Sequence, residues 1–173
     1  MGRGISNVRK LSLGGILAAM AVICVFLASI LPTSRISFYV LSSFFVSVLI
    51  IESGIKNGWI FYFATSFLAF SVVSIKIRAL PYIMFFGLYG IIKYYIEKLN
   101  NRIFEIVLKL IYFNLSLAAI YFITKELFLQ DMEIKLQLWA IALILQIVFI
   151  IYDYVYTLFI GYYNQKLKNI LKI

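Results

Sequence analysis

Ionisable side chains within apolar stretches are the residues of this chain whose types and spacing could do chemistry. Asp153 is the one acidic side chain well inside a long apolar segment. A charge near the centre of a membrane-spanning helix costs about 2.5 to 3.5 kcal/mol on insertion scales, so Asp153 should face other helices and have a partner. Lys109 reaches a similar depth in the preceding segment, which runs in the opposite direction. We predict that Lys109 approaches Asp153, or that tyrosines such as Tyr94 donate hydrogen bonds to its carboxylate.

The depth of this buried polar pair bears on its role. At roughly 1.5 Å per residue, Asp153 lies about 6 Å from the middle of its segment, on the side of the chain termini. Any carboxylate inside a membrane could take part in a proton relay, but no second acidic residue lies at the depth of Asp153. We therefore expect Asp153 and Lys109 to serve structure or coupling between helices rather than contact with a ligand.

The residues that most enzymes use for catalysis are scarce in this chain. It contains no His and one Cys, Cys24, which excludes a disulfide within the chain, the usual zinc ligand sets and a Ser-His-Asp triad. A glycine-rich phosphate loop of the G-x-x-x-x-G-K-[ST] type is also missing, so the chain is not its own ATPase. We expect a protein that is not an enzyme and that holds no metal and no cofactor.

The elements that must position these side chains are membrane helices. Of the 173 residues, 64% are hydrophobic and 13% are charged, which lies well outside the balance of a soluble domain. A hydrocarbon core of about 30 Å needs about 20 apolar residues per helix, and the apolar runs of this chain approach that length. The composition predicts an all-α integral membrane protein.

Polar and turn-forming breaks divide the chain into six apolar runs. Pro32 follows the first run, and the first run exceeds the roughly 7 to 15 apolar residues of a secretory signal, so we expect it to remain as a helix. The pattern predicts one domain over residues 1–173, a compact bundle of six transmembrane helices. The expected helices cover residues 11–31, 36–51, 58–74, 79–96, 103–123 and 137–161.

The distribution of positive charge predicts the orientation of the bundle. An even number of helices places both termini on one side, and 11 of the 16 Lys and Arg residues then fall on that side. By the positive-inside rule the N- and C-termini are cytoplasmic, and most of the net charge of +9 serves topology and anionic lipid rather than nucleic acid. Frequent Ile, Lys, Tyr, Phe and Asn favour an AT-rich bacterial genome, hence a multi-pass protein of a bacterial cytoplasmic membrane.

Small residues gather at the cytoplasmic end of the first expected helix. At a spacing of four, Gly14 lies below Ala18 and Gly15 lies below Ala19, which makes this end of the helix flat. In lipid such a face lets two helix backbones approach closely. Two kinds of helix could pack on this face: another helix of the same chain, or a helix of a separate membrane protein.

A short basic N-terminus, this small-residue face, six helices in fewer than 200 residues and cytoplasmic termini together resemble the substrate-binding S components of energy-coupling factor transporters. The resemblance covers the whole chain in topology, and the chain departs from the family's Ala-x-x-x-Ala pattern by placing Gly at the first small position. It implies that Gly14, Gly15, Ala18 and Ala19 dock on an energising module, namely a transmembrane coupling subunit and two ATPases.

The resemblance also implies a vitamin-like small solute bound in the outer half of the bundle. Aromatic rings beside a few polar groups would suit a flat, partly polar ligand, although Tyr, Trp, Lys and Arg are also common at any membrane interface. The outer cations favour an anionic solute, whereas the acids of the last outer loop favour a cationic one. The residues expected at that depth are Arg35, Tyr39, Lys76, Arg78, Tyr82 and Trp139. Asn114 and Gln146 are expected near the middle of the membrane, where either could form the floor of the cavity.

Two other function classes stay open. A membrane scaffold subunit of the rod-shape-determining type has a similar size and helix number, and it would bind partner membrane proteins without a ligand-sized outer cavity. A small membrane enzyme that acts on lipids is the least supported, because no paired carboxylates, nucleophile with a base, or metal ligands are found in the sequence.

Overall fold

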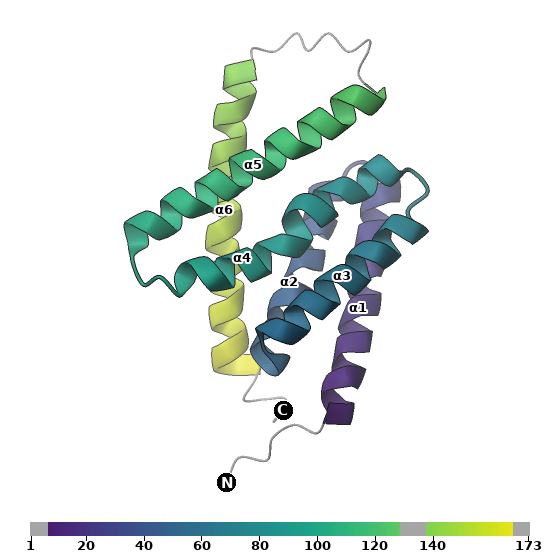
Figure 1. The fold of residues 1–173 in the computed structure, drawn as a ribbon, viewed down its shortest axis with the longest axis vertical. Helices are drawn as coiled ribbons and strands as arrows, with labels where there is room; N and C mark the ends of the chain where they lie inside the picture. Colours follow the sequence, from purple (N-terminus) through teal and green to yellow (C-terminus); the bar gives the residue numbers. More distant parts are fainter. Residues whose placement is uncertain (1–6, 129–137, 168–173) are drawn as a thin grey trace.

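The structure of the protein is a computed structural model that describes residues 7–128 and 138–167, and the side chains of residues 10–124 and 143–165. Over these residues it contains helices only (Figure 1). The α-helices are α1 (Asn7–Ile30), α2 (Arg35–Ser53), α3 (Ile55–Val72), α4 (Gly87–Glu97), α5 (Arg102–Phe128) and α6 (Leu138–Tyr162). Three shorter helical segments are η1 (Lys76–Ala79), η2 (Tyr82–Phe86) and η3 (Tyr163–Leu167).

Five stretches are long and apolar enough to cross a membrane, which indicates a membrane protein. They are Lys10–Ile30, Arg35–Ser53, Lys76–Glu97, Arg102–Thr124 and Leu143–Gln165. The remaining helix, α3, occupies the expected place but is not one of the five, because Lys, Asn, Trp, Tyr, Ser and Thr lower the hydropathy of its 18 residues. A sixth span and cytoplasmic termini therefore stay predictions.

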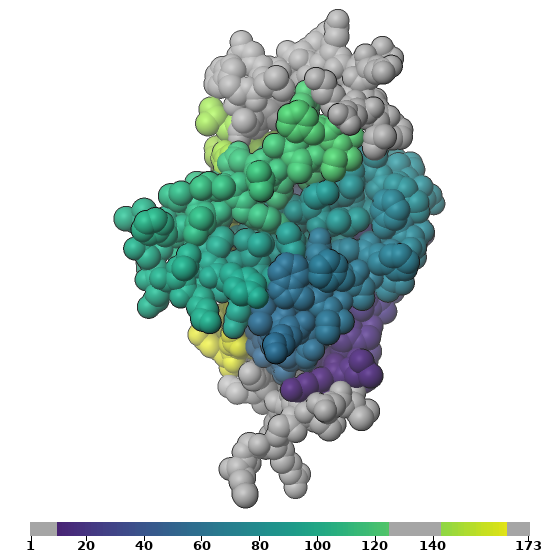
Figure 2. Space-filling view, viewed as in Figure 1, coloured from purple at the N-terminus to yellow at the C-terminus, as the bar shows by residue number. Residues whose placement is uncertain are grey.

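The two ends of the helical bundle provide a frame of reference. Figure 1 shows that α1 begins and α6 ends at the same end of the molecule, which we call the basal end. The opposite end, where α1 ends and η1 begins, is the distal end. In the space-filling view of the same side, α5 and the α3–α4 region cover this face, and α6 is visible only near its two ends (Figure 2).

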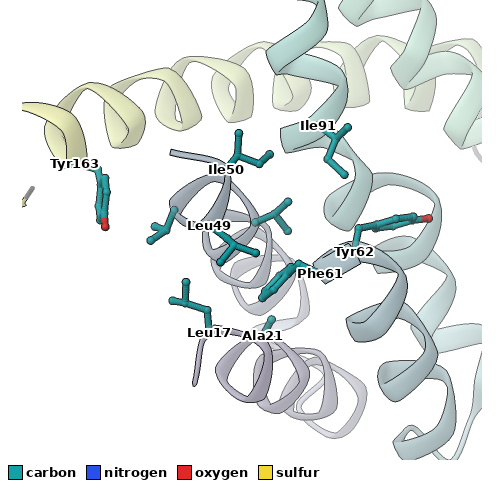
Figure 3. Close-up of a cluster of buried hydrophobic side chains, with 10 residues drawn as sticks. Leu17, Ala21, Leu49, Ile50, Phe61, Tyr62, Ile91 and Tyr163 are labelled. Atoms are coloured by element: carbon teal, nitrogen blue, oxygen red, sulfur yellow. The ribbon is translucent and has the colours of Figure 1, made fainter. Parts of the chain in front are cut away.

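The hydrophobic core begins where α1, α2 and α3 pack side by side. Ala21 of α1 is fully buried, and Leu49 of α2 and Phe61 of α3 are 3% and 4% exposed. Figure 3 shows these side chains together with Ile91 of α4 and Tyr163, which follows α6. Burial of large apolar side chains against one another therefore holds the first three helices and α4 in one unit.

The fourth expected helix, residues 79–96, is not one regular helix. The chain runs from the 3₁₀ turn η1 through Leu80 and Pro81 into the π-helical segment η2 and then the regular helix α4. Pro81 has no backbone N–H and cannot donate to the preceding turn, so the helix changes its hydrogen-bond pattern there. The expected helix is confirmed as one apolar helical segment, Lys76–Glu97, while the π-helical turns inside it were not predicted.

Candidate functional site

Four charged side chains meet between α4, α5 and α6. Lys93 contacts Asp153 and lies 2.8 Å from Glu97. Lys109 contacts the same two acids, at 2.9 Å from Glu97 and 3.2 Å from Asp153. Each lysine therefore contacts both acids, and we call these four residues the charge cluster. The predicted approach of Lys109 to Asp153 is confirmed.

The two lysines of the charge cluster are buried, whereas the side chains of Asp153 and Glu97 are partly exposed, at 25% and 37%. Lys93 is 1% exposed and Lys109 is 6% exposed, while two acids balance the two lysines. Tyr89 donates a hydrogen bond of 2.5 Å to Asp153, and the Lys93 ammonium donates one of 2.8 Å to the hydroxyl of Thr157. These bonds satisfy charges that would otherwise be costly in the membrane interior.

Sequence reasoning missed Lys93, Glu97 and Tyr89. It placed Lys93 among the charges of the cytoplasmic side and expected Tyr94 as a tyrosine donor, but Tyr94 is 43% exposed. The signal was present in the spacing, because Tyr89, Lys93 and Glu97 follow one another at intervals of four and so share one face of α4.

The π-helical segment η2 is held by hydroxyl groups from the helices on both sides. Tyr62 of α3 donates to the carbonyl of Ile83 at 2.8 Å. Tyr112 of α5 donates to the carbonyls of Met84 and Phe85, at 3.0 and 3.2 Å. Irregular backbone at membrane depth is tolerated where neighbouring helices satisfy its carbonyl groups, and these tyrosines do so.

Aromatic packing around Phe85 joins η2 to α4, α5 and α6. Its ring lies against those of Tyr89, Phe113, Phe149 and Tyr152, with centroid separations between 5.4 and 6.0 Å. Tyr152 and Tyr156 of α6 also reach α2, where Tyr152 donates to the Ser43 hydroxyl and Tyr156 to the Ser43 carbonyl, each at 3.0 Å. The centre of the bundle is therefore filled by aromatic rings.

Two of the expected ligand-binding cations at the distal end bind the backbone instead. Arg78 donates to the carbonyl of Ser29 near the end of α1 at 2.5 Å. Lys76 donates to the carbonyls of Phe70 and Ser71 near the end of α3, at 2.6 and 3.2 Å. A cation at a helix C-terminus is favoured by the helix dipole, so both side chains stabilise helix ends in this structure.

The expected distal aromatics also have protein partners. Tyr39 donates a hydrogen bond to the Arg78 carbonyl and stacks on Phe86 at a centroid distance of 5.4 Å. Tyr82 is fully buried, and its hydroxyl lies 2.8 Å from that of Thr65. Arg35 is different, since its Nε is buried without a hydrogen-bond partner among the described residues.

The remaining expected site residues lie on α5 and α6. Gln146 donates to the Asn114 side chain at 2.7 Å, so this amide pair links the two helices, and Asn114 is exposed. The structure brings Arg78 and Tyr39 together, but it places Asn114 and Gln146 on other elements. The side chain of Trp139 falls outside the part of the chain that is described.

The small-residue face of α1 divides into two rows. Ala21, one turn beyond Ala18, is fully buried, and a Cβ atom built on Gly14 would lie 3.6 Å from the side chain of Leu49. The row made of Gly14, Ala18 and Ala21 therefore faces α2. By contrast, Gly15 and Ala19 are exposed, and a Cβ atom on Gly15 would meet nothing within 4 Å.

An open groove of about 590 Å³ runs beside these rows, between α1 and α3, and two residues of α2 also line it. Its lining is apolar apart from three residues, Lys10, Ser53 and Asn57. The full lining consists of Lys10, Leu11, Gly14, Gly15, Ala18, Leu49, Ser53, Asn57, Ile60, Phe61 and Ala64, and we call it the α1–α3 groove. Three of the four residues expected to dock a partner therefore line the groove, and the fourth, Ala19, is exposed outside it.

The residues that the structure describes contain no group of three or more His, Cys, Asp or Glu side chains that could hold a metal ion. The acids of the charge cluster are neutralised by lysines. Comparison with known proteins found no matching family model, curated protein or solved structure, so a function for this chain rests on its own sequence and geometry.

Proposed function

We propose that the chain is the substrate-capture subunit of an importer of the energy-coupling factor type. In this proposal it binds a vitamin-like small solute at the distal end of the bundle, and α1 docks on an energising module made of a transmembrane coupling subunit and two ATPases. The basal end is then cytoplasmic, in agreement with the basic residues that the sequence places on that side.

The observation that carries the proposal is the exposed row of Gly15 and Ala19 on α1. A membrane helix gains little from the hydrophobic effect on association, so small residues that allow close backbone contact mark helix interfaces. Intramolecular packing uses Ala21 and, more loosely, Gly14. The row at Gly15 and Ala19 is not needed for that packing, which supports a role in docking another protein.

Arg35 supports a solute site at the distal end. It begins α2, its Nε is buried without a partner among the described residues, and Tyr39 follows it by one turn. A buried, unpaired guanidinium N–H is costly, and a bound anion would satisfy it. We therefore assign the charge recognition of the solute to Arg35, and we assign Lys76 and Arg78 to the helix ends that they contact.

Co-purification from the native host tests the docking step. Gly15→Leu and Ala19→Leu should reduce recovery of a larger membrane subunit and two ATPases by at least tenfold, because a branched side chain holds the backbones apart. Ala118→Leu, the same enlargement as Ala19→Leu but on the exposed side of α5, should leave recovery unchanged. Full recovery of the complex with both α1 variants would refute docking through this row.

A membrane scaffold of the rod-shape-determining type is the second candidate. It is favoured by the distal polar groups that already have protein partners, since Lys76, Arg78, Tyr39 and Tyr82 would not need a solute. Native mass spectrometry of the protein from its host separates the two candidates. A retained small molecule that is lost in Arg35→Ala supports capture, whereas bound membrane proteins without any small molecule support the scaffold.

A further inference from the structure

We propose that the α1–α3 groove binds one anionic phospholipid, with its phosphate at Lys10, Ser53 and Asn57 and an acyl chain along the apolar remainder. This binding is a property of the chain by itself and does not depend on the proposed function. Three features of the groove support it: the polarity along its length, the hydrogen-bonding groups at one end and the size of the space.

The three polar lining residues lie at one end of the groove. Lys10 is near the start of α1, Ser53 is the last residue of α2, and Asn57 is in the first turn of α3. Because α2 runs opposite to α1 and α3, these three positions share the basal end. From there the groove passes Leu49 and Phe61 to Ala18 and Ala64, which are apolar. A polar end followed by an apolar length matches an amphiphile rather than a uniformly apolar helix.

The basal end of the groove is suited to an anion. Among the described residues Lys10 makes no ion pair, and the Ser53 hydroxyl is buried without a hydrogen-bond partner. Asn57 uses its amide on the carbonyl of Ser53 at 2.9 Å, and an amide nitrogen carries a second N–H. The N-terminus of α3 adds partial positive charge at the same end.

No acid opposes an anion within the groove. None of the lining residues is Asp or Glu. The nearest acid in sequence, Glu52, is buried outside the lining and accepts a hydrogen bond from Tyr163 at 3.2 Å. Basic pockets between membrane helices are known to recognise anionic lipid headgroups, and the charge distribution here is of that kind.

Size favours a lipid chain over a helix as the occupant. From Lys10 to Ala18 the groove extends about 12 Å at 1.5 Å per residue. A helix is about 10 to 12 Å across with its side chains, which is much wider than an acyl chain. The open groove of about 590 Å³ therefore suits the thinner occupant better. An acyl chain is thin enough to enter.

Native mass spectrometry of the purified full chain, incubated with equal amounts of phosphatidylglycerol and phosphatidylcholine, tests the site. The wild-type chain should retain one phosphatidylglycerol with a preference of roughly tenfold, the scale of a charged hydrogen bond. Lys10→Ala and Asn57→Ala should each remove most of that preference. The control is Lys56→Ala, which removes the same charge from an exposed residue beside Asn57 that does not line the groove.

The apolar part of the site needs its own variant. Ala64→Phe fills the groove from an exposed position on α3, so it should fold normally and lose the retained lipid of either headgroup. Glycerol phosphate has the phosphate but no acyl chain, so it should bind detectably to neither the wild-type protein nor the Ala64→Phe variant.

Four outcomes would overturn the inference. They are no preference for phosphatidylglycerol in the wild-type chain, an unchanged preference in Lys10→Ala, an equal loss in Lys56→Ala, and undiminished lipid retention in Ala64→Phe. None of them bears on solute capture, because the assay contains neither solute nor energising module. Circular dichroism and size-exclusion profiles that match the wild type confirm that each variant is folded.

Discussion

Lys93 of α4 and Asp153 of α6 form an ion pair in which the lysine is 1% exposed. Lys109 of α5 contacts the same carboxylate at 3.2 Å, so one acid joins three helices. Since α5 and α6 expose most of their apolar residues, this pairing is among the contacts that hold them to the rest of the bundle. Its predicted consequences can be measured.

Removal of Lys93 should destabilise the protein strongly. Lys93→Met leaves two partly exposed acids facing one lysine, and loss of an ion pair made by a buried lysine costs up to about 3 to 5 kcal/mol. The double variant Lys93→Met with Asp153→Leu keeps the neutral pair of Lys109 and Glu97, so it should recover much of that loss. Unfolding free energies in detergent decide this, with Lys98→Met at an exposed position as the control. Equal stability of Lys93→Met and the control would contradict the assignment.

Glycine should be required at Gly90 but not at Gly15. A Cβ atom on Gly90 would lie 2.5 Å from the Tyr156 hydroxyl, which is itself fixed by bonds to Ser43 and Ser47. Overpacking of this kind costs about 1 to 3 kcal/mol, so Gly90→Ala should lower thermal stability clearly. Gly15→Ala meets nothing within 4 Å and should keep or raise the melting temperature, because Ala is the better helix former. Thermal unfolding of the two purified variants, measured side by side, gives the answer.

The tyrosines that bind the π-helical segment should stabilise it through their hydroxyl groups. Tyr112→Phe and Tyr62→Phe remove hydrogen bonds to the η2 carbonyls without changing the ring. Each should cost about 0.6 to 1.7 kcal/mol, the measured scale for such bonds between membrane helices. Tyr121→Phe, at an exposed position on α5, is the matched control. The free energy of unfolding, measured by chemical denaturation, checks this. Equal losses in Tyr121→Phe, Tyr112→Phe and Tyr62→Phe would show that the hydroxyl bonds to η2 do not stabilise the protein.

Loss of Arg78 should lower the stability of the protein, whereas loss of Arg35 should lower its affinity for a solute. Arg78→Ala removes a charged hydrogen bond of 2.5 Å to the Ser29 carbonyl, so stability should fall by about 1.5 to 3 kcal/mol. Arg35→Ala removes a cation from a helix N-terminus, where positive charge is unfavourable, and should leave stability nearly unchanged. An anionic solute should instead lose affinity in Arg35→Ala. Melting curves and ligand titration of both variants check the two effects, and the reverse pattern would exclude this division.

Much of the secondary structure could be predicted from apolar runs and their breaks. The helices α1, α2, α3, α5 and α6 begin and end within a few residues of the expected ranges where they are described. The segment around Pro81 could not be predicted in detail, because a π-helical turn depends on neighbours such as Tyr62 and Tyr112 that satisfy its carbonyls. Those neighbours are 19 or more residues away in the sequence.

The candidate sites were predicted less well, because they depend on how each helix is rotated. Lys109 and Asp153 were paired correctly from their depth alone, since an unpartnered charge is too costly in lipid. Lys93 was missed because an apolar count places it near a helix end, whereas packing of α4 turns it inward. The distal cations were expected to face a solute, but nearby helix C-termini offer carbonyls that two of them bind.

The sequence by itself determined the helical class, the places of the helices, the need of Asp153 for a buried partner and the flat face at the start of α1. Composition and one-dimensional periodicity are enough for these, since they reflect transfer of each segment into an apolar environment. The tertiary structure decided which glycines are packed and which are open. It turns Ala21 inward beside α2 and leaves Gly15 at a groove, because helix rotation is set by contacts between segments that no single segment specifies.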